Sequence, residues 1–312
     1  MEDLPIIAAM RLASNTIEWM PSGILSMIAT YTHKEQYSLS KDNKSVLVGG
    51  ETITFPLPTT SHGVETIGIE LVGGNVVIIA TLTSHSDEHV AGIKRTRYVA
   101  SISPITRVCS VLSSEDVMGI FTLIGVSSDG IIYASRRIIV FEVYSYDPKT
   151  NIWSKLPGEP HGNRRWEYSG VVHKDSVYAD GGNYPCERFD IKEEKWTHEG
   201  RIIPEWRSSI LVSIRDWIFV ITCSAIDTGR INRYSPTTKT TELPHWSLPA
   251  AIFGLCKVRY QNGSLYVAGK WTTADGEVTQ TYVCDVDSKG NLLPWRVFTN
   301  PGGVDGVIPL FV

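Results

Sequence analysis

The best candidate for a metal site in the sequence is a short polar segment, SHSDEH, which begins at Ser84. In an extended chain His85, Asp87 and His89 point to one side and offer two imidazoles and a carboxylate. Such a local trio also needs a remote ligand and a second shell of hydrogen-bond partners, and no motif supplies either. We therefore expect a polar loop here, with no metal and no cofactor.

Other catalytic signatures are missing from the sequence. It contains no G-x-S-x-G elbow, no P-loop, no H-E-x-x-H and no dinucleotide-binding fingerprint. The five cysteines are widely separated and include no CxxC pair, so we expect reduced, buried thiols. Function must therefore come from a site assembled by the fold.

Charge and hydropathy exclude two classes of partner. The formal net charge is −4, and lysines and arginines are scattered, which argues against nucleic acid and against an anionic membrane surface. The first residues, MEDLPIIAAMRLASNTIEW, do not form a signal-peptide pattern, and no apolar run approaches the length of a membrane span. We expect a cytoplasmic, monomeric protein.

The apolar residues occur in short runs typical of β-strands. Runs such as SVLVGG, NVVIIATL, RRIIVFEVYSYD and DWIFVITC are rich in Val, Ile, Tyr and Phe and are separated by Gly, Asn, Asp and Pro. No 3.6-residue period persists for three turns. The pattern predicts an all-β protein with very little helix.

A repeat becomes visible from about residue 140. Tyr146-Asp147 precedes Trp153, and 43 residues later Phe189-Asp190 precedes Trp196, with each Trp six residues beyond its Asp. A third copy begins 45 residues further on at Tyr234-Ser235 and lacks the Trp, and a fourth is YVCD, which ends at Asp285, with Trp295. This period, with about four strands in it, is typical of the blades of a β-propeller.

Residues 140–246 resemble kelch repeats, in which a double glycine, an aromatic-Asp turn and a Trp recur in each blade; Gly181-Gly182 supplies the double glycine here. The resemblance implies a single closed propeller of four-stranded antiparallel blades in which the outer-strand Trp packs on the neighbouring blade. It departs from the kelch pattern at Thr222-Cys223 and Ala268-Gly269, which replace the double glycine.

Six blades are the preferred phasing, and the tail at residues 304–312 is expected to close the ring by joining the N-terminal sheet. Seven blades are the alternative, because the chain length divided by the repeat period is close to seven. The six expected blades are residues 4–58, 61–113, 115–158, 164–203, 206–247 and 249–299.

Polar and aromatic residues just before the expected innermost strands are candidates for an axial binding site. In kelch domains positions like Arg165 and Arg207 often face the channel mouth, so the resemblance implies that they do so here. The arginine forks could hold a carboxylate and the indole rings its apolar part. Alternatively, these residues are rim side chains that pair or pack between blades. The full set of candidates is His62, Glu115, Asp116, Arg165, Trp166, Arg207, His245 and Trp246.

Two main readings of function follow. The first is a stand-alone binding module that holds a protein or peptide at its axial mouth. The alternative is a small-molecule enzyme, an isomerase, lyase or cyclase, with a substrate pocket at the axis in which carboxylate and imidazole groups act as acid and base. A carbohydrate-binding lectin is a weaker third reading, suggested by 9 Trp and 13 Tyr.

Overall fold

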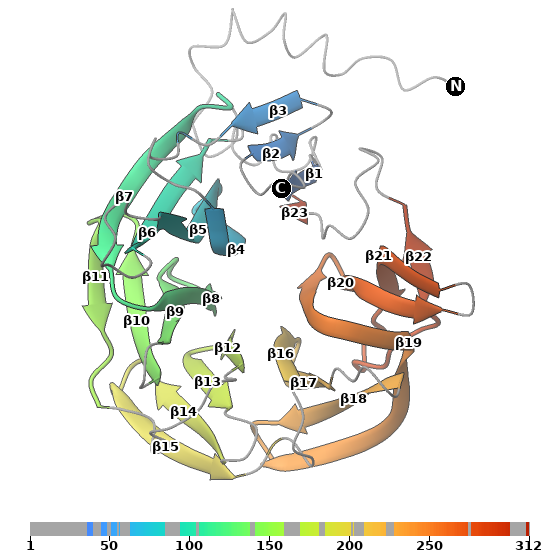
Figure 1. Ribbon diagram of the computed structural model, residues 1–312. Helices are drawn as coiled ribbons and strands as arrows, with labels where there is room; N and C mark the ends of the chain where they lie inside the picture. The colour runs from blue at the N-terminus through green and yellow to red at the C-terminus, as the bar shows by residue number, and fades with distance from the viewer. Residues whose placement is uncertain are drawn as a thin grey trace, which may run out of the picture.

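The computed structural model shows an all-β protein whose sheets stand around a central axis (Figure 1). No helix occurs among the residues that it describes. These residues are 36–39, 45–48, 51–54, 56, 63–84, 94–103, 106–137, 141–158, 169–180, 185–200, 202, 209–222, 228–273, 276–299 and 310–311.

Four of the described sheets contain four antiparallel strands each. Sheet 1 has the order β23 (Leu310–Phe311), β1 (Gln36–Leu39), β2 (Ser45–Val48), β3 (Glu51–Thr54). Sheet 2 is β4 (Gly63–Val72), β5 (Asn75–Ser84), β6 (Lys94–Ile102), β7 (Cys109–Val117). Sheet 3 is β8 (Ile120–Val126), β9 (Ile132–Arg137), β10 (Phe141–Asp147), β11 (Ile152–Lys155). Sheet 4 is β12 (Ser169–His173), β13 (Ser176–Asp180), β14 (Cys186–Asp190), β15 (Lys195–Gly200).

Sheet 5 is a seven-stranded sheet held together by one long strand. The 22-residue strand β19 pairs with β18 up to Ala251 and with β20 from there to Gln261. It therefore serves as the fourth strand of one four-stranded set (set 5a) and the first strand of the next (set 5b). The strands are β16 (Ser209–Ile214), β17 (Trp217–Thr222), β18 (Thr228–Ser235), β19 (Thr240–Gln261), β20 (Ser264–Thr273), β21 (Gly276–Asp285) and β22 (Arg296–Phe298).

The first strand of each set lies nearest the axis. Contacts between neighbouring sheets run from β23 to β4, β8, β12, β16 and β19 in that order around this axis (Figure 1). At the end of the chain β23 pairs antiparallel with β1, with Phe311 opposite Gln36, so the two ends of the described chain meet in sheet 1. The predicted all-β ring of antiparallel sheets is confirmed.

The aromatic-Asp motif is a turn that caps itself. Asp147 accepts hydrogen bonds from the Lys149 amide at 2.9 Å and the Thr150 hydroxyl at 3.0 Å. Asn151 closes the turn with a positive φ of 59°, a conformation that asparagine tolerates, and its amide oxygen accepts a bond from the Tyr146 hydroxyl. The motif therefore specifies the tight connection between β10 and β11.

The later copies keep this turn with other residues. Asp190 accepts from the amides of residues 192 and 193, and Ser235 accepts from the Thr238 amide. In the fourth copy the capping residue is Asp287, two positions after the expected Asp285. Asp285 instead binds the guanidinium of Arg296 on the next strand, so the alignment of this copy is corrected.

The repeated Trp residues pack between sheets, as predicted. Trp153 on β11 lies over Arg97 of sheet 2, with 4.0 Å from the guanidinium carbon to the ring centre. Trp196 on β15 packs with Phe189 and with apolar side chains of sheet 3 such as Val143. Each indole thus joins its own sheet to the preceding one.

Glycines on the innermost strands let neighbouring sheets approach closely. A Cβ on Gly68 of β4 would lie 2.6 Å from the Leu123 Cβ on β8, and one on Gly170 of β12 would lie 3.0 Å from Ile124. Real Cβ atoms do not come as close as the first of these distances. Gly68 is therefore required by the packing of β4 against β8.

We expect Gly68→Ala to lower the free energy of unfolding by about 1–3 kcal/mol, because the new methyl group overpacks the contact between β4 and β8. Urea denaturation measures the change. Leu123→Ala makes room for the methyl group, so Gly68→Ala should cost less in that background. Equal costs in the two backgrounds would contradict this explanation.

Candidate functional site

Most of the predicted axial residues lie outside the described residues. These are His62, Arg165, Trp166 and Arg207, together with the metal candidates His85, Asp87 and His89. His245 lies on β19, but its side chain is also outside the described set. Within that set, no group of three or more His, Cys, Asp or Glu side chains could hold a metal ion.

Glu115 and Asp116 precede the innermost strand β8 in sequence, as predicted, but they do not lie in a connection. They lie on β7, the outermost strand of sheet 2, which extends to Val117 because it continues to pair with β6. Asp116 lies 2.7 Å from the Lys94 ammonium, whose hydrogen bond lowers the pKa of this carboxyl. The structure therefore places both carboxylates at the outer edge of the ring.

Glu115 supports a contact between two sheets. It lies 2.5 Å from the guanidinium of Arg97, whose side chain is only 7% exposed. The same guanidinium lies between the rings of Phe121 and Trp153 of sheet 3. A desolvated arginine over aromatic faces, with a carboxylate at its edge, stabilises the packing of sheet 2 on sheet 3.

Trp246 is also an inter-strand packing residue. It lies on the first half of β19 and stacks on Phe219 of β17, with ring centres 5.7 Å apart. The guanidinium of Arg233 lies 4.2 Å from the Trp217 ring and is held by Glu242 at 2.6 Å. Trp246 precedes the innermost half of β19, which begins at Ala251, but β19 runs through Trp246 without a turn, so this residue lies on a strand and not in a connection.

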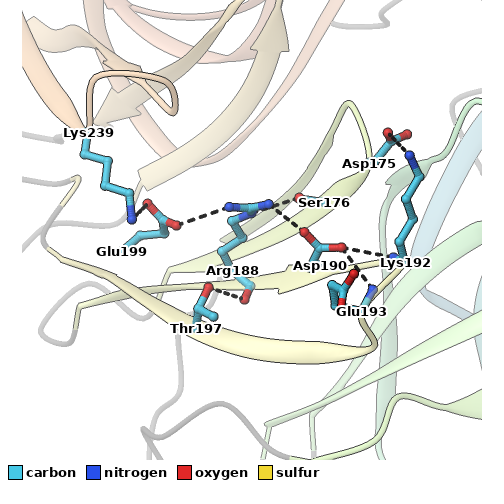
Figure 2. A network of polar contacts seen from close by, with 9 residues as sticks. All are labelled: Asp175, Ser176, Arg188, Asp190, Lys192, Glu193, Thr197, Glu199 and Lys239. Carbon is cyan, nitrogen blue, oxygen red and sulfur yellow. Dashed lines mark hydrogen bonds and ion pairs between the residues drawn. The ribbon is translucent and has the colours of Figure 1, made fainter.

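A polar network joins sheet 4 to set 5a (Figure 2). Arg188 on β14 binds Asp190 at 2.7 Å and Ser176 at 2.9 Å and faces Glu199 at 3.8 Å. Glu199 is the extra residue of a β-bulge in β15. Its carboxylate, 1% exposed, accepts a hydrogen bond from the Tyr234 hydroxyl and lies 3.5 Å from the Lys239 ammonium. Since cations surround the buried carboxylate, we interpret this network as a structural bridge.

One histidine-serine pair in the described residues resembles a base and a nucleophile. Nδ1 of His173 on β12 lies 2.9 Å from the Ser213 hydroxyl on β16. The histidine is buried, and burial lowers its pKa to about 4, with a smaller contribution from the Lys174 charge. Asp216 binds Lys174 at 2.8 Å rather than the imidazole. The pair lacks an orienting carboxylate and joins two innermost strands.

Charged residues on the innermost strands are confined to two strands. The strands β8, β12 and β16 contain no Asp, Glu, Lys or Arg. In contrast, β4 carries Glu65 and Glu70, and the second half of β19 carries Lys257 and Arg259. Lys257 and Arg259 alternate with the apolar Val258, so both side chains lie on the same face of β19. The sequence analysis missed this pair.

Arg259 reaches a sheet that is not its neighbour in the ring. One of its terminal nitrogens donates to the Ile69 carbonyl of β4 and lies 3.3 Å from the Glu70 carboxylate. Sheet 1 lies between β4 and set 5b in ring order, because β23 follows β22 along the chain and β23 contacts β4. The side chain of Arg259 therefore links two innermost strands at the axis directly.

The two ends of the ring differ in their connections. The two-residue turns at 73–74, 174–175, 215–216 and 262–263 each follow a first strand, so they lie at one end. The strand ends that flank residues 85–93, 156–168 and 201–208 lie at the other end, because strands alternate in direction. We call this second end the long-connection face; in sequence, Arg165 and Arg207 belong to connections that begin and end there.

Comparisons with solved structures support the fold. The structure of YjhT, a kelch-repeat β-propeller, matches with a TM-score of 0.53 and 12% sequence identity, covering 84% of this chain and 98% of YjhT. The chain has the fold of kelch-repeat β-propellers. Hydrazine synthase of Kuenenia stuttgartiensis matches with a TM-score of 0.50 and 11% identity, over 76% of this chain and 67% of that one. No protein-family model and no curated protein matches.

The described part of the chain contains no helix that is long and apolar enough to cross a membrane.

We expect the buried His173 to make the protein sensitive to acid. Its folded pKa of about 4 lies below the ordinary 6.5, so its contribution to stability is complete above pH 6.5 and is lost as the pH falls through about 4. The loss is at most about 3 kcal/mol. His173→Gln can keep a hydrogen bond to Ser213 but cannot gain a proton. Urea denaturation between pH 7 and 4 should show a steeper fall for the wild type, and parallel curves would refute the assignment.

Proposed function

We propose that this protein is a binding module that holds a protein or peptide partner at its long-connection face. The asymmetry of the connections carries this proposal. Most turns at one end of the ring are short, although the connection 286–295 also lies there, whereas the other end contains the connections that lead from an outer strand to the next innermost strand, of which 156–168 and 201–208 are long and 118–119 is short. Connections of this kind commonly carry binding residues on a rigid scaffold.

The residues of these connections have the chemistry to bind an acidic peptide. Arg165 and Trp166 lie in the connection 156–168, and Arg207 lies in 201–208. An arginine fork can accept a carboxylate in two parallel hydrogen bonds, and an indole ring can cover the neighbouring apolar part of the ligand. We therefore propose a partner that presents Asp or Glu beside an apolar residue.

Selection of peptides from a random phage-displayed library tests the proposal. We expect enriched peptides to carry Asp or Glu, and Arg165→Ala with Arg207→Ala to weaken their binding by about tenfold or more, as for charged anchors at other interfaces. Fluorescence anisotropy with a labelled peptide measures the affinity, and circular dichroism checks that the fold persists.

The matched control removes two positive charges from the opposite end of the ring. Lys149→Ala and Lys192→Ala change exposed side chains in the short turns at 148–151 and 191–194. This double variant should bind the selected peptides like the wild type. Peptides that lose affinity in the control and keep it in the arginine variant would contradict the proposal. A failure to enrich any peptide would favour a small-molecule ligand instead.

A further inference from the structure

We infer that Lys257 and Arg259 form a binding site for a small carboxylate on the face of β19 from which Arg259 reaches β4. This inference rests on the proposed function, because it assumes that the bound partner or ligand carries a carboxylate that reaches the innermost strands. The site lies on the innermost strands themselves and is separate from the arginines of the long-connection face.

Within the described part of the chain, the guanidinium of Arg259 has one unsatisfied hydrogen-bond donor. Its side chain is 14% exposed, and one terminal nitrogen is occupied by Ile69 and Glu70 of β4. The other terminal nitrogen, Nη1, is buried and has no hydrogen-bond partner among the described residues. A buried donor of a charged group is costly when it is left unpaired. An oxygen atom of a bound carboxylate could satisfy it.

Lys257 supplies a second cation on the same face. Its side chain is exposed, yet burial is the main cause that lowers its pKa, and the charge of Arg259 lowers it further. No ion pair joins Lys257 to a carboxylate of the described residues. Two neighbouring cations repel each other, and an anion between them would relieve that repulsion.

The balance of charge selects the class of ligand. Of the described side chains, Lys257 and Arg259 contribute two positive charges, and Glu70 is the carboxylate beside them. Because Glu70 offsets part of the positive charge, the pair suits a monocarboxylate better than a dianion such as phosphate. The planar guanidinium also matches a planar carboxylate. Glu70 occupies part of the guanidinium and thus competes with the ligand.

Titration with benzoate at constant ionic strength, followed by the line broadening of its proton NMR signals, tests the site. Benzamide is the neutral comparison, and phosphate, which has no observable proton signal, is the dianionic one and is tested by its ability to displace benzoate. We expect benzoate to bind, with benzamide and phosphate at least about tenfold weaker. Lys257→Met should weaken benzoate binding about tenfold, and Glu70→Gln should strengthen it about threefold by removing the competing carboxylate.

The control variant changes a cation outside the proposed site. Lys192→Met removes a cation from the outer turn of sheet 4 at 191–194 and should leave benzoate binding unchanged. Equal binding of benzoate and benzamide, or unchanged benzoate binding in Lys257→Met, would overturn the inference. Weaker benzoate binding in Glu70→Gln would also overturn it, because Glu70 would then support the site. Lys257→Met leaves Arg165 and Arg207 intact. Loss of benzoate binding with retained peptide binding would therefore show that the carboxylate site is distinct from the proposed peptide site.

Discussion

The largest core clusters of the described residues each join two successive sheets, so the structure depends on packing between sheets. One core cluster joins Val77 and Val99 of sheet 2 to Tyr146 of sheet 3, and another joins Phe141 of sheet 3 to Phe189 of sheet 4. Two further clusters join sheet 4 to set 5a and set 5a to set 5b. A row of sheets packed in this way leaves an exposed apolar face at each end unless it closes. Pairing of β23 with β1 brings the two ends together.

The sequence predicted those features that depend on local chemistry. A capped turn needs Asp147 and a residue that tolerates positive φ, and an indole such as Trp153 needs a neighbouring sheet to cover it. Both requirements leave a pattern that can be recognised in the sequence. Glu115 was misplaced because sheet 2 carries no aromatic-Asp and Trp marker, and the polar outer strand β7 reads like a connection before the next strand. Trp246 was misplaced because β19 passes from one set to the next without a turn.

The axial charges show what local patterns do not reveal. Lys257 and Arg259 resemble the exposed face of an ordinary strand, and only the ring places them on an innermost strand opposite Glu70. Their alternation with Val258 within a strand expected to be apolar on both faces was the available signal. Elsewhere in the described ring, arginines such as Arg97 and Arg233 are covered by an aromatic ring and paired with a glutamate. Lys257 has neither kind of contact among the described residues, which distinguishes it as a residue for binding.

A crystal structure of the protein with 4-bromobenzoate tests this account most directly, because the bromine atom gives an anomalous signal that marks the ligand without ambiguity. The account predicts a peak beside the face of β19 from which Arg259 reaches β4, with the carboxylate in hydrogen-bond contact with Nζ of Lys257 and Nη1 of Arg259. A fully occupied ligand elsewhere, with none at this face, would contradict it.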